Sequence, residues 1–172
     1  LSGLARRGFA NSSCGVCGKE SIRAVHRRIK PLSARWKVHA ALLAELPDRV
    51  RAAQAAFDRT GGLHAAGLFT RTGELLVARE DIGRHNAMDK IVGWAALESR
   101  LPLSQTILLR SGRLGFEIAQ KALVAGIPLI AAISGPSSLA VSLARENGMT
   151  LVAFLRGDAL TIYSGAERIG LA

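Results

Sequence analysis

Apolar and polar positions along the chain predict a series of strands from about residue 38 onward. His64 to Thr70 and Glu74 to Arg79 are strand-like runs joined across Arg71-Thr72-Gly73, which predicts a hairpin. Further strands are predicted over residues 106–109, 127–133, 150–155 and 160–163. The run over 127–133 is too apolar to have a face in water, which is typical of a sheet covered on both sides.

Four segments have the apolar spacing of amphipathic helices. The first opens at Leu46-Pro47-Asp48, where proline suits a first turn, has an apolar stripe of Val50, Ala53 and Phe57, and ends at Gly61-Gly62. The second, over residues 84–101, has an apolar stripe that includes Leu97. The others are predicted over residues 114–124 and 137–147. Since strands and helices alternate, the pattern predicts a three-layer α/β domain with a largely parallel sheet.

Composition supports one folded domain with a distinct amino-terminal part. The chain has 172 residues, of which 49% are hydrophobic and only two are cysteines, which excludes a disordered chain and a disulfide scaffold. We expect residues 1–37 to form a flexible cysteine-bearing loop region and residues 38–172 the α/β domain. The long uncharged stretch over 122–144 is interrupted by glycine and proline, so we expect no membrane span. The chain shows no signal segment, and we expect a cytoplasmic protein.

The chain is strongly basic. Lys and Arg number 23 against 13 Asp and Glu, a net charge of +10, which favours polyanionic partners such as nucleic acid, anionic lipid or a phosphate-rich small molecule. The basic residues are mostly dispersed and few aromatic residues accompany them, which argues against binding of single-stranded nucleic acid. A generally basic enzyme without such a partner remains an alternative.

Both cysteines occur in one C-x-x-C motif, Cys14-Gly15-Val16-Cys17, among small residues that leave the sulfur atoms accessible. Nearby basic residues would favour the reactive thiolate, and two close thiols allow one to accept sulfur and the other to resolve it. A zinc site would need two more soft ligands, and the spacing of His26 and His39 does not suit one. A thioredoxin-like motif would need a preceding strand, and none is evident; buried structural cysteines are disfavoured by the small neighbours.

Polar residues collect where predicted strands lead into helices. Glu80 to Ala87, Ser111-Gly112-Arg113 and Ser134 to Ser138 each have this position, with Arg84 and His85 in the first. Because such turns form the ligand crevice of an open α/β sheet, three of them favour a ligand with several phosphates. The alternative is ordinary helix capping by Asp81 and the serines. His64, at a strand start, is more typical of a core histidine than of a ligand.

In this order, the motifs resemble those of the FdhD family, sulfurtransferases needed to make active formate dehydrogenase. The matching pieces are SSCGVCGK, GGLHAAGLF, EDIGRHNAMDKIVG, GR..FEIAQKALVAGIP, SGPSSLAVSLA and TLVAFLRGD. The resemblance implies a cytidine-deaminase-like α/β/α sandwich with a mixed sheet. Deaminase chemistry itself is excluded, because His64-Ala65-Ala66 lacks the required glutamate and no cysteine follows Cys17.

The resemblance also implies a function. Sulfur would pass from a cysteine desulfurase through a persulfide on Cys14, with Cys17 as its partner, to bis-molybdopterin guanine dinucleotide molybdenum cofactor, which is bound as substrate before insertion into formate dehydrogenase. No structural metal is expected. The resemblance places the cofactor-binding segment on Phe154, Leu155, Arg156, Gly157, Asp158 and Ala159. Further contacts to the cofactor are expected from Arg84, His85, Arg113 and Ser137, at the amino termini of helices.

Other consequences of the resemblance concern the whole protein. Family members carry a further segment ahead of the cysteine motif, so this chain is expected to lack an amino-terminal part, and they are typically homodimers. A cofactor-binding chaperone without sulfur chemistry is the alternative function; it predicts that both cysteines are dispensable while Arg156 is not. A basic nucleic-acid-binding module would show steep loss of affinity with salt, but the dispersed charge speaks against it, and we expect no nucleic-acid partner.

Overall fold

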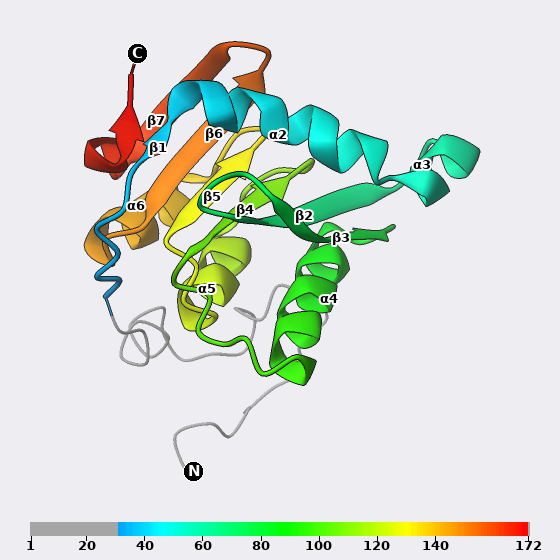
Figure 1. Ribbon diagram of the computed structural model, residues 1–172, viewed down its shortest axis with the longest axis horizontal. Helices are drawn as coiled ribbons and strands as arrows, with labels where there is room; N and C mark the ends of the chain where they lie inside the picture. The colour runs from blue at the N-terminus through cyan, green and yellow to red at the C-terminus, as the bar shows by residue number, and fades with distance from the viewer. Residues whose placement is uncertain (1–30, 172) are drawn as a thin grey trace.

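The computed structural model describes residues 31–171 of the chain. The first regular element among them is the short strand β1, and helices and strands then alternate to the carboxyl end (Figure 1). The elements are β1 Val38–His39, α2 Ala40–Ala52, α3 Ala55–Thr60, β2 His64–Thr70, β3 Leu75–Asp81, α4 Arg84–Leu97, β4 Thr106–Arg110, α5 Phe116–Val124, β5 Leu129–Ala132, α6 Ser138–Glu146, β6 Thr150–Arg156, β7 Ala159–Ser164, the 3-10 helix η2 Ala166–Arg168 and β8 Ile169–Gly170.

The main sheet has six strands in the order β3-β2-β4-β5-β6-β7. Only β4, β5 and β6 are parallel to one another, while β2 is antiparallel to both its neighbours and β7 is antiparallel to β6. The prediction of a largely parallel sheet is therefore wrong, and the mixed sheet implied by the resemblance is confirmed. The short turns after β2 and β6 allow only antiparallel pairing. The sequence favoured parallel strands because a strand buried on both faces is typical of a parallel sheet. Strand β2 is such a strand, buried at five of its seven positions, although it is antiparallel.

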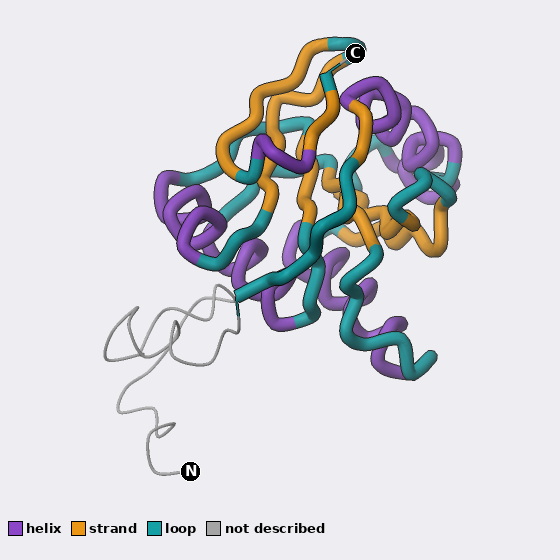
Figure 2. Tube along the Cα trace, turned by 60° about the vertical axis from the view of Figure 1, so that its left-hand side comes forward, coloured by secondary structure: helices purple, strands orange, loops and turns teal. Residues whose placement is uncertain are grey.

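Three layers are confirmed by the two hydrophobic clusters on either side of the sheet. Helices α4, α5 and α6 cover one face, where Met88, Ile118 and Leu143 are fully buried. Helix α2 covers the other face through Leu43, Leu46 and Val50. Figure 1 shows α2 across one side of the strands and the other three helices across the opposite side, and Figure 2 shows the same separation from a second direction.

The helix predicted to open at Leu46 begins earlier and is divided in two. Helix α2 starts at Ala40 and contains Pro47 in its interior, and a break after Ala52 separates it from α3. Leu43, Leu46 and Val50 recur at helical spacing and are buried, so packing against the sheet extends the helix ahead of the proline despite the lost N–H group. Ala53, predicted to be apolar and inward, is exposed.

The helix predicted over residues 84–101 ends at Leu97, and the assignment of Leu97 to its buried stripe is wrong, because that side chain is 87% exposed. Ser99, with φ of 53°, has left the helical conformation. The hairpin of β2 and β3 is confirmed, and the remaining elements lie within a few residues of their predicted bounds. Within residues 31–171, no helix combines the length and apolar character needed to cross a membrane.

The segment over residues 31–37 and the carboxyl end are held together. Strand β1 pairs in parallel with β8, forming a separate two-stranded sheet. Arg168 is only 7% exposed; its Nε donates a hydrogen bond to the carbonyl oxygen of Ala34 at 2.9 Å, and its Nη1 donates to Thr150 Oγ1 at 3.1 Å. Trp36 donates from its indole to the carbonyl oxygen of Ser104. These contacts fix the chain that follows the cysteine motif against the α/β domain.

Candidate functional site

The topology brings all the predicted polar turns to one edge of the sheet. The carboxyl ends of β4, β5 and β6 meet there because these strands are parallel. Strand β2 runs the other way and therefore begins at this edge, with Ala66 opposite Arg110. Strand β3 ends there, with Asp81 opposite His64. The sequence placed these turns at strand ends, and the structure shows that they share one edge of the sheet.

Backbone hydrogen bonds join two of these turns. The N–H group of Leu114 donates to the carbonyl oxygen of Gly135 at 3.1 Å, and that of Ser137 donates to the carbonyl oxygen of Leu114 at 2.9 Å. The N–H group of Ile133 donates to the carbonyl oxygen of Arg110 at 3.0 Å. The turns after β4 and β5 therefore form one connected unit, which fixes the starts of α5 and α6 relative to each other.

The two acidic residues of the EDIGRHN motif have structural roles. The carboxylate of Glu80 accepts hydrogen bonds from two N–H groups in the first turn of α3, at 2.8 and 2.9 Å. Asp81 Oδ1 accepts from the N–H group of Gly83 at 2.8 Å, and Asp81 Oδ2 lies 2.7 Å from Lys90 Nζ. The hydrogen bond with Lys90, followed by that from Gly83, lowers the pKa of Asp81 to about 2. Both carboxylates therefore stabilise the local conformation of the motif and of the helix next to it.

The basic residues of the same motif lie at the start of α4. Arg84 is half-buried, and His85 is buried in the first turn with its Nε2 3.7 Å from Glu117 Oε2. Burial, followed by the positive charge of Arg84, lowers the pKa of His85, and Glu117 opposes this shift. Near neutral pH the imidazole is therefore neutral. No side chain caps this end of α4, so its first N–H groups are available to an anion.

Arg110 is a site residue that the sequence reasoning missed. It ends β4 directly before Ser111-Gly112-Arg113, is fully buried, and donates a hydrogen bond from Nη2 to the carbonyl oxygen of Arg84. Burial lowers its pKa to about 10. The sequence feature that could have identified Arg110 is its position at the end of a largely apolar strand. His64, which was expected to be a core histidine, is half-buried beside this group, and burial followed by Arg110 lowers its pKa.

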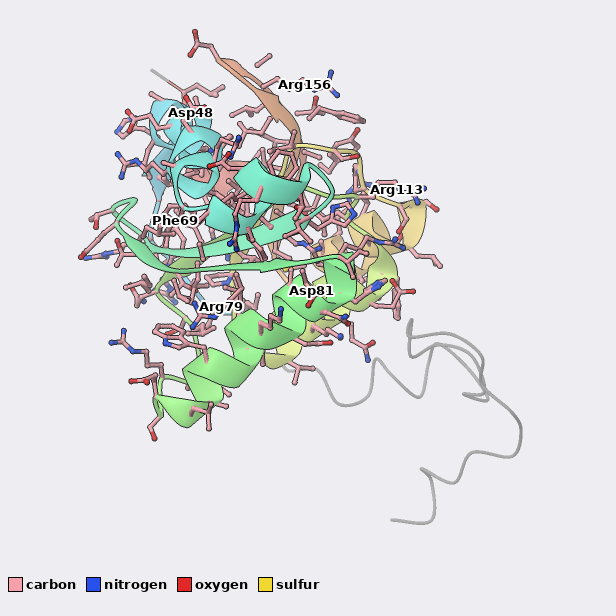
Figure 3. All side chains as sticks on the ribbon, turned by 90° about the vertical axis from the view of Figure 1, so that its right-hand side faces the viewer. Asp48, Phe69, Arg79, Asp81, Arg113 and Arg156 are labelled. Carbon is pink, nitrogen blue, oxygen red and sulfur yellow. The ribbon has the colours of Figure 1, made fainter. Side chains whose placement is uncertain are left out.

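Arg113 and Ser137 are both predicted to contact the cofactor, but only one of the two side chains is free of other hydrogen bonds to residues 31–171. Arg113 is exposed on the turn after β4, and Figure 3 shows its side chain extending outward, as that of Arg156 does from β6. Ser137 Oγ accepts a hydrogen bond from the N–H group of Ala140 at 3.2 Å and so caps α6, the role that the capping alternative assigned to it. Its hydroxyl hydrogen can still be donated to a ligand.

The segment from Phe154 to Ala159 ends β6, turns at Gly157-Asp158 and begins β7. Phe154 has φ of 54°, and its side chain is 44% exposed. Its ring lies over Gly135, where a Cβ atom would come within 2.7 Å of it. Leu155 is buried in the cluster under α2, so only its backbone could meet a ligand. Arg156 is exposed two strands away from β4, about 10 Å across the edge.

Cys14 and Cys17 lie outside the described residues, so the structure does not relate them to this edge. Across residues 31–171, no group of three or more His, Cys, Asp and Glu side chains could hold a metal ion. The described part of the site is therefore one edge of the sheet, here called the basic edge, with four arginines, Arg84, Arg110, Arg113 and Arg156, and two histidines. Its chemistry suits the binding of anionic groups.

Known proteins match this chain over most of its length. The model of the FdhD/NarQ family matches residues 3–170. Proteins named sulfur carrier protein FdhD are 56% identical in Streptomyces coelicolor, over 98% of this chain, and 48% identical in Saccharolobus solfataricus, over 94% of it. The chain covers 61% of the length of each of these two relatives.

A solved structure is also similar. It is a crystal structure assigned to a formate dehydrogenase accessory protein from Desulfotalea psychrophila, with a TM-score of 0.76 and 30% sequence identity. The match covers 86% of this chain and 62% of that one. The similarity therefore extends from the sequence motifs to the arrangement of the helices and strands.

Proposed function

Because the chain belongs to the FdhD/NarQ family, we propose that it carries sulfur from a cysteine desulfurase to bis-molybdopterin guanine dinucleotide molybdenum cofactor before the cofactor enters formate dehydrogenase. One observation carries this proposal: the family match runs through both the C-x-x-C motif and the basic edge. The names of the relatives support sulfur carriage, and that of the structural neighbour supports the link to formate dehydrogenase. In this role the protein is a sulfurtransferase, acting as a cytoplasmic homodimer.

The basic edge is proposed to bind the cofactor as substrate. Each of the cofactor's two guanine dinucleotide parts has a pyrophosphate, and arginine side chains with uncapped helix termini suit such groups. Arg84 and Arg113 lie near the turn after β4, and Arg156 lies two strands away. That separation suits a ligand with anionic groups at more than one point. Phe154, exposed between these positions, offers an aromatic face to a base.

The sulfur chemistry is proposed for Cys14. Its thiolate attacks the outer sulfur of the donor's persulfide, so that a new sulfur–sulfur bond forms on Cys14 and the donor's sulfur–sulfur bond breaks, leaving a donor thiolate. No net oxidation occurs in this exchange, because the sulfane sulfur changes carriers. Delivery to the molybdenum of the cofactor requires this sulfane sulfur to be reduced to the level of sulfide, and the Cys14 and Cys17 thiols supply the two electrons as they form a disulfide.

Cys17 gives two routes for release. In one it attacks the inner sulfur of the Cys14 persulfide, which forms a Cys14–Cys17 disulfide and releases hydrosulfide, and a dithiol reductant then restores both thiols. In the other it attacks the outer sulfur, which moves the persulfide to Cys17 and leaves Cys14 as a thiolate. That thiolate then attacks the inner sulfur on Cys17, which again forms the disulfide and releases hydrosulfide. In both routes Cys14 is the entry point.

The test is the intact mass of the protein after incubation with a cysteine desulfurase and cysteine, followed by peptide mapping. We expect a gain of one sulfur, removable by reductant, on the peptide that contains Cys14 and Cys17. Cys14→Ala should abolish this gain and sulfur transfer while guanine-nucleotide binding survives, and Cys17→Ala is the matched control for loss of one thiol. Sulfur transfer by Cys14→Ala would exclude Cys14 from the mechanism.

The chaperone alternative has a different outcome in the same experiment. If the folded protein binds guanine nucleotide but gains no sulfur, and if Arg156→Ala weakens nucleotide binding while both cysteine variants retain it, the protein shelters the cofactor without sulfur chemistry. The basic edge supports this alternative as a binding site, since its described residues are suited to anions rather than to sulfur transfer.

A further inference from the structure

Arg110 is a buried cation whose hydrogen-bonding groups are only partly used. Its exposure is 0%, and Nη2 donates to the carbonyl oxygen of Arg84. Its Nε and Nη1 atoms have no hydrogen-bond partner among residues 31–171. The negative charge of Asp89 raises the pKa of Arg110, but Asp89 is itself paired with Lys121. The guanidinium therefore lacks a dedicated counter-charge in the described structure.

The groups around Arg110 are also basic. Arg84 and Arg110 both act on His64 and on His85 and lower the pKa of each, in addition to the effect of burial. Lys121 acts on His85 in the same direction, and only Glu117 opposes it. His85 Nε2 is a third buried nitrogen atom without a hydrogen-bond partner in the part of the chain that the structure describes. The cluster thus combines positive potential with unused polar atoms.

Such an arrangement is costly in the absence of a ligand. A buried polar group without a hydrogen-bond partner destabilises the folded protein, and the effect is larger when the group is charged. Buried charges in folded proteins are therefore usually paired, and an unpaired one calls for a specific reason. An anion bound against Arg110 would supply the missing acceptors and the missing charge together.

The position of the cluster suits an anion that approaches the basic edge from solvent. The α4 helix has 14 residues, and no side chain caps its amino terminus, at which Arg84 and His85 are the first two residues. A Cβ atom on Gly112 would lie 3.2 Å from His64 Nδ1 and 3.6 Å from Arg84 Cβ, so these side chains meet at this glycine. Both are half-buried, and the cluster therefore reaches the surface at this turn.

We propose that Arg110, Arg84 and the amino terminus of α4 form a binding site for a phosphoryl group, with His64 and His85 at its margin. A phosphoryl group has several acceptor oxygens and a full negative charge, which matches the unused guanidinium donors and the helix N–H groups. The inference deepens the proposed function and rests on it for one point only: in the sulfur carrier, this group would be a phosphate of the guanine dinucleotide. Free inorganic phosphate is the other source of the same chemistry.

The first test uses the unmodified protein, so it does not depend on the folding of a variant. The imidazole signals of His64 and His85 are followed by NMR as a function of pH, with and without inorganic phosphate, GDP or guanosine. An anion beside an imidazole favours the charged form, so we expect bound phosphate to raise the pKa of both histidines by about 1. If both inorganic phosphate and GDP change the histidine signals, the site is open to nucleotide phosphates. If inorganic phosphate alone changes them, the site binds free phosphate.

The second test compares Arg110→Met with Arg100→Met, an exposed arginine that stacks on Trp94 at 5.1 Å. Calorimetric titration should show at least about a tenfold loss of phosphate affinity for Arg110→Met, because hydrogen bonds to a charged group are lost, and no loss for Arg100→Met. If neither inorganic phosphate nor GDP changes the histidine signals of the unmodified protein, the inference is wrong. Sulfur loading is measured separately: loading without a phosphate response overturns only this site, and a phosphate response without loading overturns only the sulfur-carrier function.

Discussion

Replacing Arg168 with methionine should weaken the attachment of the segment that leads from the cysteine motif into the domain. Arg168 is buried, and its guanidinium joins Ala34, in the segment over residues 31–37, to Thr150, at the start of β6. The next two residues form β8, which pairs with β1. Methionine keeps the apolar stem but removes these two hydrogen bonds and the longer contact of 3.5 Å with the exposed carboxylate of Glu167, so the substitution isolates the contribution of the guanidinium.

The expected loss of stability follows from these two hydrogen bonds. A hydrogen bond from a charged group contributes about 1.5–3 kcal/mol, and a buried acceptor left without a donor adds a further penalty. Part of this loss is offset, because the variant no longer has to bury a charge. Since Ala34 is only half-buried and its carbonyl can be rehydrated, we expect a net decrease in the free energy of unfolding of about 2–3 kcal/mol.

Urea unfolding followed by circular dichroism measures this change, and the midpoint should fall by about 1 M. Hydrogen exchange should also become faster at Val38 and Ile169, which pair between β1 and β8. Arg71→Met, at an exposed arginine, is the matched control and should change the free energy of unfolding by less than about 0.5 kcal/mol. If Arg168→Met unfolds at the same urea concentration as the control, Arg168 does not hold the segment and the reasoning is refuted.

Two further predictions concern the acidic residues of the EDIGRHN motif. Glu80→Ala should lower the free energy of unfolding by about 1 kcal/mol and speed hydrogen exchange in α3, because two N–H groups of that helix lose their acceptor; unchanged exchange would show that Glu80 does not cap α3. Asp81, whose pKa is lowered from 3.8 to about 2 chiefly by Lys90, should contribute stability above its unfolded pKa and lose it as the pH falls through the folded value. The difference in stability between the unmodified protein and Asp81→Asn should therefore shrink as the pH falls from about 4 to about 2, and a constant difference would contradict this role.

Local sequence patterns predicted the elements of the fold well, because those elements depend on neighbouring residues. The hairpin of β2 and β3 follows from two runs flanking Arg71-Thr72-Gly73, and α5 and α6 follow from helical apolar spacing. The predictions failed where contacts between residues far apart in the sequence determine the structure. Pro47 favoured a helix start, but burial of Leu43 and Leu46 against the sheet extends the helix ahead of it.

The direction of the outer strands was another property that the sequence did not specify. An apolar run that is buried on both faces has the same composition in a parallel or an antiparallel sheet. The choice is made by pairing: β2 lies between β3 and β4 and is antiparallel to both. This pairing has a consequence for the site, since it brings the start of β2 and the end of β3 to the edge where β4 ends.

The sequence by itself determined the residues with chemistry: the C-x-x-C motif, the basic and polar turns, and the order of motifs that identifies the family. It determined these because residue type and spacing are local properties. Only the tertiary structure decided that Arg84, Arg110, His64 and His85 act on one another, and that Glu80, Asp81 and Ser137 are committed to structural hydrogen bonds. Burial and charge–charge proximity depend on which strands pair, and strand pairing joins residues that are far apart in the chain.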